Sequence, residues 1–350
     1  MTAATGGPRP AGGRAPSTND TAGAGRIAAA FVRAREAGRV ALIPYVVAGY
    51  PDGETSVAVA LAAIDAGADI LEVGLPYSDP LADGTTLQRA SGIALAAGAT
   101  LERSLDLVRR IARERPGVPL VTMGYANQLI GGGDGRERAR ALVAAGASGT
   151  IVADLTPDEG APFEAAAAEA GLAVVYLVAP TTSPERRATI AARTGGFLYC
   201  VSLVGITGAR SSLPPEVGRY VRAVKAASPV PVAVGFGVSR PAHVRALVRA
   251  GADGVIVASA LVDALGPDGR DVAALGLRRR RRWAWMAALV LEGISVVQVL
   301  LVVASSGIEG AVGLGLGQLV VAPLVFFYLT RPHVAAAFGH RRERRGRPAA

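Results

Sequence analysis

Short apolar runs alternate with Ala-rich stretches of helical periodicity along most of the chain. Each Ala-rich stretch ends in a glycine turn and is followed by a β-rich run. Glycine just past a helix is the expected stop, because it adopts the left-handed conformation without steric cost. Successive turns lie roughly 25 residues apart, or two to three times that, which fits one strand plus one helix per unit. The turns are Ala66-Gly67-Ala68-Asp69, Ala145-Gly146-Ala147-Ser148, Ala170-Gly171-Leu172, Thr194-Gly195-Gly196 and Ala250-Gly251-Ala252-Asp253.

The β-rich runs predict eight strands. They lie near residues 41–48, 69–74, 118–123, 149–153, 173–178, 197–201, 231–236 and 254–257. Eight alternating strand and helix units predict a (β/α)8 barrel, also called a TIM barrel. A doubly wound open sheet has the same alternation and remains the alternative. In a barrel, the active site lies at the C-terminal ends of the strands.

The composition changes twice along the chain, which predicts three parts. Residues 1–25 are mostly Gly, Ala, Pro, Ser and Thr, so we expect a disordered tail. This tail has no apolar core of a signal peptide, and we expect it to stay in the cytoplasm. Residues 26–277 form the predicted barrel domain, with a first helix over Arg26–Ala37. Residues 278–350 have a different character.

The last part of the chain contains two apolar segments, 283–304 and 311–329, each about long enough to span a bilayer as a helix. Arginines flank the pair, at 278–282 before the first segment and at 331–347 after the second. The positive-inside rule therefore places both ends in the cytoplasm. We expect a transmembrane hairpin that tethers a cytoplasmic barrel to the membrane. A buried pair of hydrophobic helices is the alternative.

The net charge of +9 is confined to the end of the chain. Residues from Arg278 onward carry 11 Arg and 3 Glu, whereas the preceding residues carry 26 basic and 25 acidic side chains. The barrel therefore has no electrostatic reason to bind nucleic acid. The single cysteine, Cys200, lies in an apolar run, permits no internal disulfide and suits a reducing compartment.

The second predicted strand leads into a loop that carries carboxylates. Glu72 lies on the strand, and Asp79 and Asp83 follow in the loop. A carboxylate on a buried strand has a desolvation cost that a partner, a protonation change or a ligand must offset. We expect Glu72 and Asp83 to converge on one cleft. A structural ion-pair role for Glu72, and turn or capping roles for both aspartates, remain open at this point.

The loops after the last strands suit a phosphate. Gly235-Phe236-Gly237 and Ala258-Ser259 present backbone N–H groups at helix starts, where this fold commonly binds a phosphate. Residues 202–210 have the Gly and Thr content of a mobile lid. No metal-ligand cluster or Ser/His/Asp set is visible. The pattern favours acid/base chemistry on a phosphorylated small molecule.

The carboxylate stretch, Leu71-Glu72-Val73-Gly74-Leu75-Pro76-Tyr77-Ser78-Asp79-Pro80-Leu81-Ala82-Asp83-Gly84, resembles the signature of the tryptophan synthase alpha subunit family. Supporting segments occur in the family's order over about residues 26–275. They are Pro44-Tyr45, Ala48-Gly49-Tyr50-Pro51, Tyr125-Ala126-Asn127, Ala153-Asp154-Leu155, Ala179-Pro180-Thr181-Thr182, Gly205-Ile206-Thr207-Gly208-Ala209-Arg210, Gly235-Phe236-Gly237 and Gly254-Val255-Ile256-Val257-Ala258-Ser259-Ala260.

The resemblance implies retro-aldol cleavage of indole-3-glycerol phosphate to indole and glyceraldehyde 3-phosphate, in tryptophan biosynthesis. It implies that Glu72 transfers protons and that Asp83 holds the indole N–H. It places the substrate against Tyr199, Thr207, Gly208, Phe236, Gly237, Ala258 and Ser259. It also implies an alpha2-beta2 heterotetramer with a beta subunit that carries pyridoxal phosphate, and no cofactor or metal in this chain.

Three positions depart from the family pattern. Thr85 stands where proline is usual, Ala258 where glycine is usual, and Val47 where threonine is common. The family's long closing helix is also replaced by a short piece before Arg278. None of these changes removes a catalytic carboxylate. A membrane-tethered, catalytically weakened barrel that serves as a binding or scaffolding module is the alternative function.

Overall fold

The computed structural model of the chain describes residues 20–202, 215–235, 237–238 and 241–272. Its strands are β1 (Ala41–Val47), β2 (Leu71–Gly74), β3 (Leu120–Gly124), β4 (Ala147–Val152), β5 (Ala173–Val175), β6 (Leu177–Val178), β7 (Leu198–Val201), β8 (Val232–Gly235) and β9 (Gly254–Val257). Its helices are α1 (Ala22–Glu36), α2 (Gly53–Asp65), α3 (Thr85–Ala96), α4 (Leu101–Glu114), α5 (Ala126–Leu129), α6 (Arg136–Ala144), α7 (Pro157–Ala170), α8 (Pro184–Arg193), α9 (Pro215–Ala227), α10 (Pro241–Arg249) and α11 (Ser259–Asp263).

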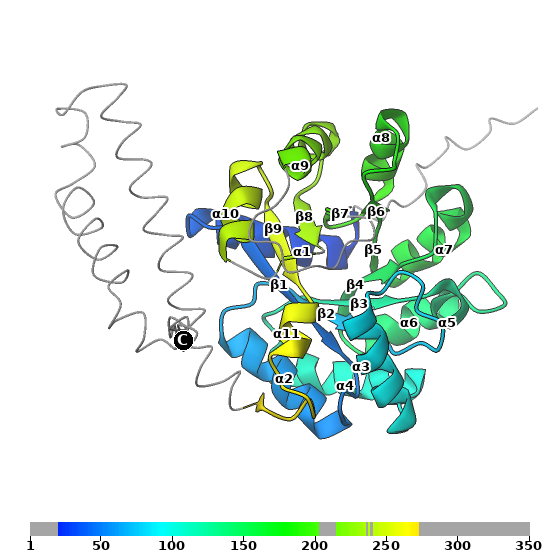
Figure 1. The fold of residues 1–350 in the computed structure, drawn as a ribbon. Coiled ribbons are helices and arrows are strands. Elements are labelled where there is room, and N and C mark those ends of the chain that lie inside the picture. Colours follow the sequence, from blue (N-terminus) through cyan, green and yellow to red (C-terminus); the bar gives the residue numbers. More distant parts are fainter. Residues whose placement is uncertain (1–19, 203–214, 236, 239–240, 273–350) are drawn as a thin grey trace, which may run out of the picture.

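The strands form one parallel sheet that closes on itself (Figure 1). Their order is β5-β4-β3-β2-β1-β9-β8-β7-β6, and the two end members, β5 and β6, are separated along the chain by Tyr176 alone. They are two halves of one barrel strand, of which β5 pairs with β4 and β6 pairs with β7. The predicted (β/α)8 barrel is confirmed, and the open-sheet alternative is excluded.

The division of the fifth strand is the largest difference from the predicted strands. Tyr176 turns its backbone N–H to Thr194 Oγ1 at 2.9 Å, so this N–H leaves the ladder. Its phenol lies outside the barrel and donates to Glu164 of α7 at 2.5 Å. Gly160 leaves the space for that phenol, because a Cβ there would lie 1.9 Å from the Tyr176 oxygen.

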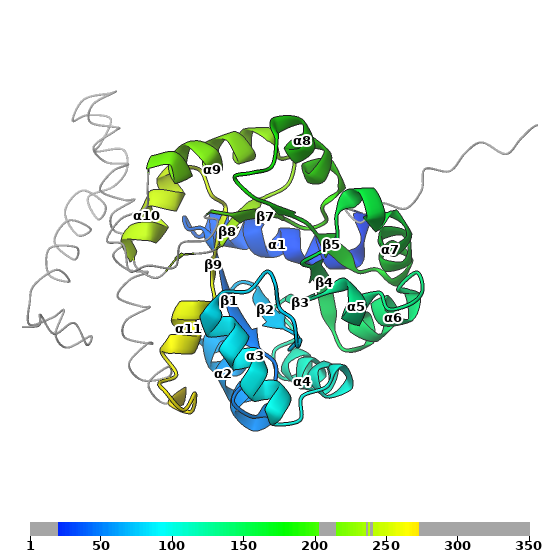
Figure 2. The same cartoon turned by 45° about the vertical axis from the view of Figure 1, so that its right-hand side comes forward.

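Helix α1 closes the N-terminal end of the barrel. It packs against β1, β4 and β5 and lies across that end (Figure 2). A Cβ on Gly23 would lie 1.8 Å from the Ser148 carbonyl oxygen, so the helix approaches β4 as closely as glycine allows. Thr21 caps α1 by accepting from the Ala24 N–H at 3.1 Å. The helix therefore begins at Ala22, before the predicted start at Arg26.

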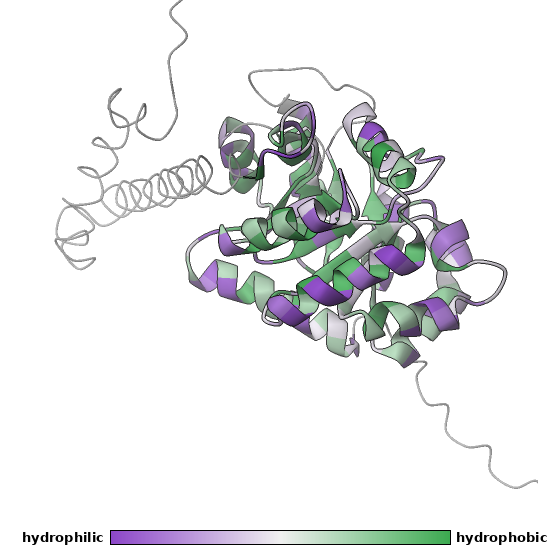
Figure 3. Ribbon diagram, turned by 90° about the horizontal axis from the view of Figure 1, so that it is seen from below, coloured by the Kyte–Doolittle hydropathy of each residue, from purple (hydrophilic) through white to green (hydrophobic). Residues whose placement is uncertain are grey.

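Hydrophobic residues predominate in the strands, and hydrophilic residues gather on the helices around them (Figure 3). Helix α4 shows the pattern, because its buried residues recur at helical spacing: Ser104, Leu105, Val108 and Ile111. Strands β2, β3, β4, β8 and β9 are buried along their whole length. This is expected for a parallel sheet, whose strands are covered on both faces.

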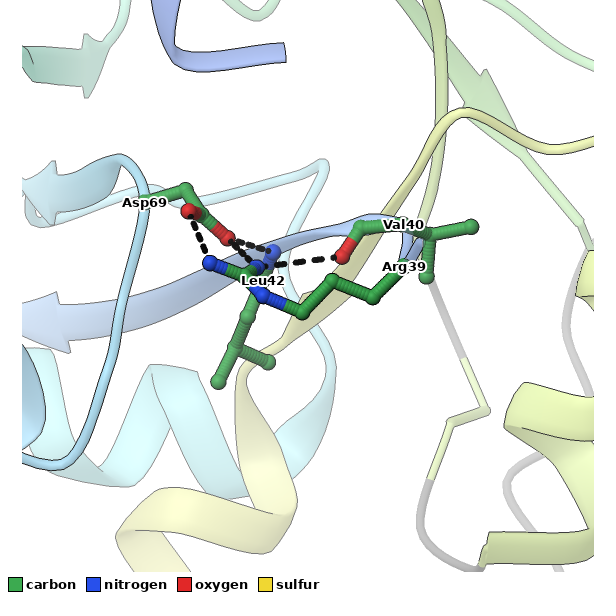
Figure 4. Close-up of polar contacts among 4 residues, drawn as sticks. All are labelled: Arg39, Val40, Leu42 and Asp69. Carbon is green, nitrogen blue, oxygen red and sulfur yellow. Dashed lines mark hydrogen bonds and ion pairs between the residues drawn. The ribbon is translucent and has the colours of Figure 1, made fainter. Parts of the chain in front are cut away.

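Asp69, in the glycine turn before β2, holds the start of β1 (Figure 4). Its carboxylate forms two hydrogen bonds with the Arg39 guanidinium, at 2.5 and 2.8 Å, and accepts from the Leu42 N–H at 2.8 Å. Asp253, in the matching turn before β9, repeats the arrangement. It accepts from Lys225 at 2.6 Å and from the Val232 N–H of β8 at 2.7 Å. The repeated Gly-Ala-Asp turn therefore fixes neighbouring strands at the N-terminal end.

Some of the sequence predictions fall outside the described residues. These include nearly all of the disordered tail over 1–25 and both membrane spans, 283–304 and 311–329. Within the described part, none of the helices combines the length and the apolar character needed to cross a bilayer.

Replacing Asp69 with alanine is expected to lower the free energy of unfolding by about 1.5–3 kcal/mol, because the change leaves the Arg39 guanidinium and the Leu42 N–H without this acceptor. The matched control is Asp65→Ala, which breaks the exposed Asp65–Arg115 pair and should cost clearly less. Urea unfolding followed by circular dichroism measures both. Equal losses in the two variants would contradict a special role for the Asp69 contacts at the start of β1.

Candidate active site

Glu72 is buried on β2 and faces the barrel interior. It pairs in register with Tyr45 of β1 and Val121 of β3, and its side chain is 1% exposed. Neither of its carboxylate oxygens has a hydrogen-bond partner among the residues that the structure describes. Burial raises the pKa of Glu72 to about 8, and the nearby charge of Asp83 adds to the effect. The side chain is therefore mostly protonated at neutral pH.

Asp83 lies in the loop between β2 and α3. Burial raises its pKa to about 6, and a hydrogen bond from the Tyr125 phenol opposes that rise. At neutral pH, Asp83 is therefore mostly ionised while Glu72 is mostly protonated. The predicted convergence of these two side chains on one site is supported by the effect of the Asp83 charge on Glu72. Asp79 is exposed and accepts from Ser78 Oγ at 2.6 Å, as a turn residue does.

Helix α3 begins directly after Asp83 and supports the loop. Thr85 is the first helical residue, a position where proline is favoured but where other residues are tolerated. The Gln88 side chain reaches back and donates to the Asp83 carbonyl at 2.9 Å and to the Pro80 carbonyl at 3.4 Å. The loop is therefore tied to the helix without the usual proline.

Two tyrosines from different strands enter the same interior, and only one of them, Tyr199, was among the predicted site residues. Tyr199 of β7, the residue expected beside the substrate, is 4% exposed, and Tyr45 of β1 is equally buried. A Cβ on Gly235 would lie 2.4 Å from the Tyr199 oxygen, and one on Gly74 would lie 1.8 Å from the Tyr45 oxygen. The strand-end glycines thus make room for both phenols.

The charges of both carboxylates act on both tyrosines. The pKa of Tyr45 and that of Tyr199 are raised well above the usual value, mainly by burial and then by the charges of Asp83 and Glu72. Both phenols therefore remain protonated hydrogen-bond donors over the physiological pH range. Tyr45 was not predicted as a site residue, because an aromatic residue on a buried strand such as β1 is common and does not by itself indicate a site.

The predicted phosphate-binding residues follow β8 and β9. Gly237 has φ 72°, which favours glycine, and its carbonyl oxygen lies 3.0 Å from Nδ1 of the buried His243 on α10. Ala258 has φ −112°, so this position does not require the glycine that is usual in the family. Ser259 is exposed and begins α11. Thr207, Gly208 and Phe236, the other predicted substrate contacts, lie outside the described residues.

The loop after β3 contacts the carboxylate loop at several points. Gln128 donates to the Pro76 carbonyl at 2.7 Å, and the Asn127 amide nitrogen donates to the Tyr77 oxygen at 3.4 Å. Tyr125 contacts Ala82 and Asp83. Among the described residues, no three His, Cys, Asp or Glu side chains are grouped so that they could hold a metal ion.

The closed barrel, with two carboxylates of different protonation state at the carboxyl ends of its strands, defines the class of (β/α)8 enzymes that use acid/base chemistry. A sequence model of the family "Tryptophan synthase alpha chain" matches residues 31–279. The chain belongs to the tryptophan synthase alpha chain family. Alpha chains of this family need no cofactor, since pyridoxal phosphate belongs to the beta subunit.

Individual relatives support this assignment. The tryptophan synthase alpha chain of Roseiflexus castenholzii is 46% identical over 240 residues, which covers 69% of this chain and 91% of the relative. That of Halorhodospira halophila is 44% identical over 262 residues, covering 75% and 94%. Among solved structures, tryptophan synthase of Mycobacterium tuberculosis is 43% identical with a TM-score of 0.64, covering 72% of this chain and 95% of that one. The a2b2 complex of Pyrococcus furiosus is 38% identical with a TM-score of 0.65, covering 70% and 97%.

Replacing Glu72 with glutamine is expected to stabilise the protein, and increasingly so as the pH rises. In the folded state the carboxyl retains its proton up to about pH 8, whereas its ordinary pKa is 4.5. Between these values the folded state binds more protons than the unfolded state, so the stability of the unmodified protein falls as the pH rises. Glutamine does not titrate and avoids this loss.

The gain at pH 9 relative to pH 5 should be about 2–5 kcal/mol, as measured by urea unfolding at the two pH values. Glu137→Gln, on the exposed surface of α6, is the control and should show no such gain. A Glu72→Gln variant whose stability relative to the unmodified protein is the same at both pH values would contradict the raised pKa.

Proposed function

We propose that this barrel cleaves indole-3-glycerol phosphate to indole and glyceraldehyde 3-phosphate in tryptophan biosynthesis. The observation that carries the proposal is Glu72, a carboxyl group 1% exposed in the barrel interior, whose oxygens have no described partner. A structural ion pair would have given this group a cation. A catalytic acid whose partner is the bound substrate is expected to have a raised pKa and carboxyl oxygens without a protein hydrogen-bond partner, and Glu72 has both properties.

The proton movements follow from the two protonation states. Protonated Glu72 gives its proton to C3 of the indole ring, and positive charge develops on the ring nitrogen. The Glu72 carboxylate then takes the proton of the glycerol hydroxyl next to the ring. The carbonyl of glyceraldehyde 3-phosphate forms, the carbon–carbon bond breaks, and its electron pair returns to the ring to give indole. One proton has passed from oxygen to carbon, and Glu72 ends as it began.

Asp83 serves this reaction as a carboxylate. Its pKa of about 6 leaves it ionised at neutral pH, so it accepts a hydrogen bond from the indole N–H. That bond strengthens as the ring becomes positive, and it therefore stabilises the transition state more than the bound substrate. Tyr199, which is buried on β7, is assigned to the side of the indole ring. Thr207 and Gly208 are assigned to the lid, and Phe236, Gly237, Ala258 and Ser259 to the phosphate end.

The partner is proposed from the relatives. The Pyrococcus furiosus structure is that of an a2b2 complex, and we propose that this chain joins a beta subunit in the same alpha2-beta2 arrangement. Indole would then pass to the pyridoxal phosphate of that subunit. The scaffolding alternative is not favoured, because the two carboxylates are present and their protonation states differ as the reaction requires.

The full-length protein is expected to release indole from indole-3-glycerol phosphate, and Glu72→Gln should lower kcat by at least about 100-fold, because the amide cannot carry the proton. Indole is measured colorimetrically, with and without a beta subunit. Glu137→Gln is again the control and should match the unmodified protein. No turnover by the unmodified protein under either condition would refute the enzyme and favour the scaffold.

We propose in addition that residues 278–350 form a membrane hairpin, with spans over 283–304 and 311–329. The support is the sequence: two apolar segments of sufficient length, with arginines at 278–282 and 331–347 on the side expected to face the cytoplasm. The barrel would then be held at the cytoplasmic surface of the membrane.

Cell fractionation tests the anchor. The full-length chain should be recovered with the membranes, should resist extraction by high salt and should be released by detergent. A chain ending at Leu277 should be absent from the membrane fraction. Recovery of the full-length chain without membranes, or only as a trimmed barrel, would contradict the proposal. High salt distinguishes a true span from attraction of the arginines to anionic lipids.

A further inference from the structure

We propose that Tyr125 is a positioning residue that orients the Asp83 carboxylate and the backbone before it through its phenol oxygen. Tyr125 follows β3 and precedes α5, so it belongs to a different loop from Asp83. The inference rests on the proposed function, in which Asp83 accepts the indole N–H. It assigns to Tyr125 a role in that step without contact with the substrate.

One phenol oxygen joins two successive residues of the carboxylate loop. The Ala82 N–H donates to the Tyr125 oxygen at 3.0 Å, and the Tyr125 O–H lies 3.4 Å from Asp83 Oδ2. Because the backbone N–H occupies an acceptor position on the phenol, the phenol proton is free to point at the carboxylate. The same side chain therefore fixes both the backbone before Asp83 and the orientation of its carboxylate.

The Tyr125 ring itself is held firmly. It is 4% exposed and stacks on the Tyr77 ring, with 4.9 Å between the ring centroids and 23° between the planes. Gln128 accepts from the Tyr125 N–H at 3.4 Å while its amide nitrogen donates to the Pro76 carbonyl at 2.7 Å. The phenol oxygen is thus fixed before a substrate arrives, which a positioning group requires.

The groups that face Asp83 give the phenol an electrostatic role. They come from three barrel strands and from the loop after β3: Tyr45, Glu72, Tyr199 and Tyr125. Glu72 is protonated at neutral pH, so within the described residues the donors around Asp83 are neutral. Asp154 is a further charge near Tyr125. Burial drives Asp83 toward its neutral form, and the Tyr125 hydrogen bond acts in the opposite direction.

The phenol remains a donor throughout the range in which Asp83 titrates. Burial and the Asp83 charge raise the pKa of Tyr125 far above its usual value, so the phenol proton is not lost. The separation of 3.4 Å is long for an O–H···O hydrogen bond. Hydrogen bonds of catalytic groups are often long without substrate and shorten in its complex. We therefore expect the effect of Tyr125 to be at least as large during turnover as in the free protein.

The titration of Asp83 tests the contact without any need for activity. The full-length chain is labelled with 13C in the aspartate carboxyl groups, and the Asp83 signal is assigned from its loss in Asp83→Asn. Tyr125→Phe should raise the midpoint of the Asp83 titration by about one pH unit. Tyr77→Phe, which keeps the stacked ring and loses a hydroxyl that contacts Asn127, should leave the midpoint unchanged. An unchanged midpoint in Tyr125→Phe, or equal shifts in both variants, would overturn the proposal.

Kinetics with the beta subunit tests the consequence. In Tyr125→Phe, the acidic limb of the kcat/KM profile should move to higher pH by the same amount, so kcat/KM should fall about tenfold near pH 5 but only about twofold at pH 7. Tyr77→Phe should match the unmodified protein. A loss of equal size at every pH would indicate a merely structural role and refute the inference. If the unmodified protein has no turnover, the proposed function fails, and the carboxyl titration still decides the contact.

Discussion

The burial of the Glu72 carboxyl group is the constraint on which the rest of the site depends. A carboxyl group that is 1% exposed, with no described partner, is a source of instability that grows as the pH rises. The barrel tolerates it because the surrounding strands are buried along their length and held in register at the N-terminal end. In return, the interior supplies a proton at neutral pH that no solvated glutamate could retain.

A single buried acid is not sufficient, because the proposed reaction also needs a carboxylate that stays ionised. The structure separates the two groups by environment. Glu72 lies on a strand inside the barrel, whereas Asp83 lies in a loop and is faced by the Tyr125 phenol. The ionised Asp83 in turn raises the pKa of Glu72 further. The charge of Asp83 thus helps to set the protonation state of Glu72, and a change at the loop after β3 that alters Asp83 also affects Glu72 on β2.

The sequence predicted the features that a local pattern determines. Glycine turns mark the ends of helices, so the eight strands and the barrel followed from them, and the position of Glu72 on β2, before the loop that carries Asp83, followed from the barrel. Contacts between loops leave no such pattern. Tyr45 and Tyr125 are amphipathic, so a buried aromatic position does not reveal where its hydroxyl points. The break at Tyr176 also depends on Thr194 and Glu164, which are distant in the sequence.

Aspartates at the two ends of the barrel have different roles, which are set by their positions in the fold. Asp69 and Asp253 precede strands, and each binds a cation and a backbone N–H of a neighbouring strand. Asp83 follows a strand, and the causes that shift its pKa include a phenol but no cation among the described residues. A cation beside Asp83 would keep it ionised more strongly. It would also compete with the positive charge that develops on the indole ring, and so remove the attraction on which the proposed step depends. A phenol supplies the hydrogen bond without that charge, which is why a neutral donor suits the C-terminal end of this barrel.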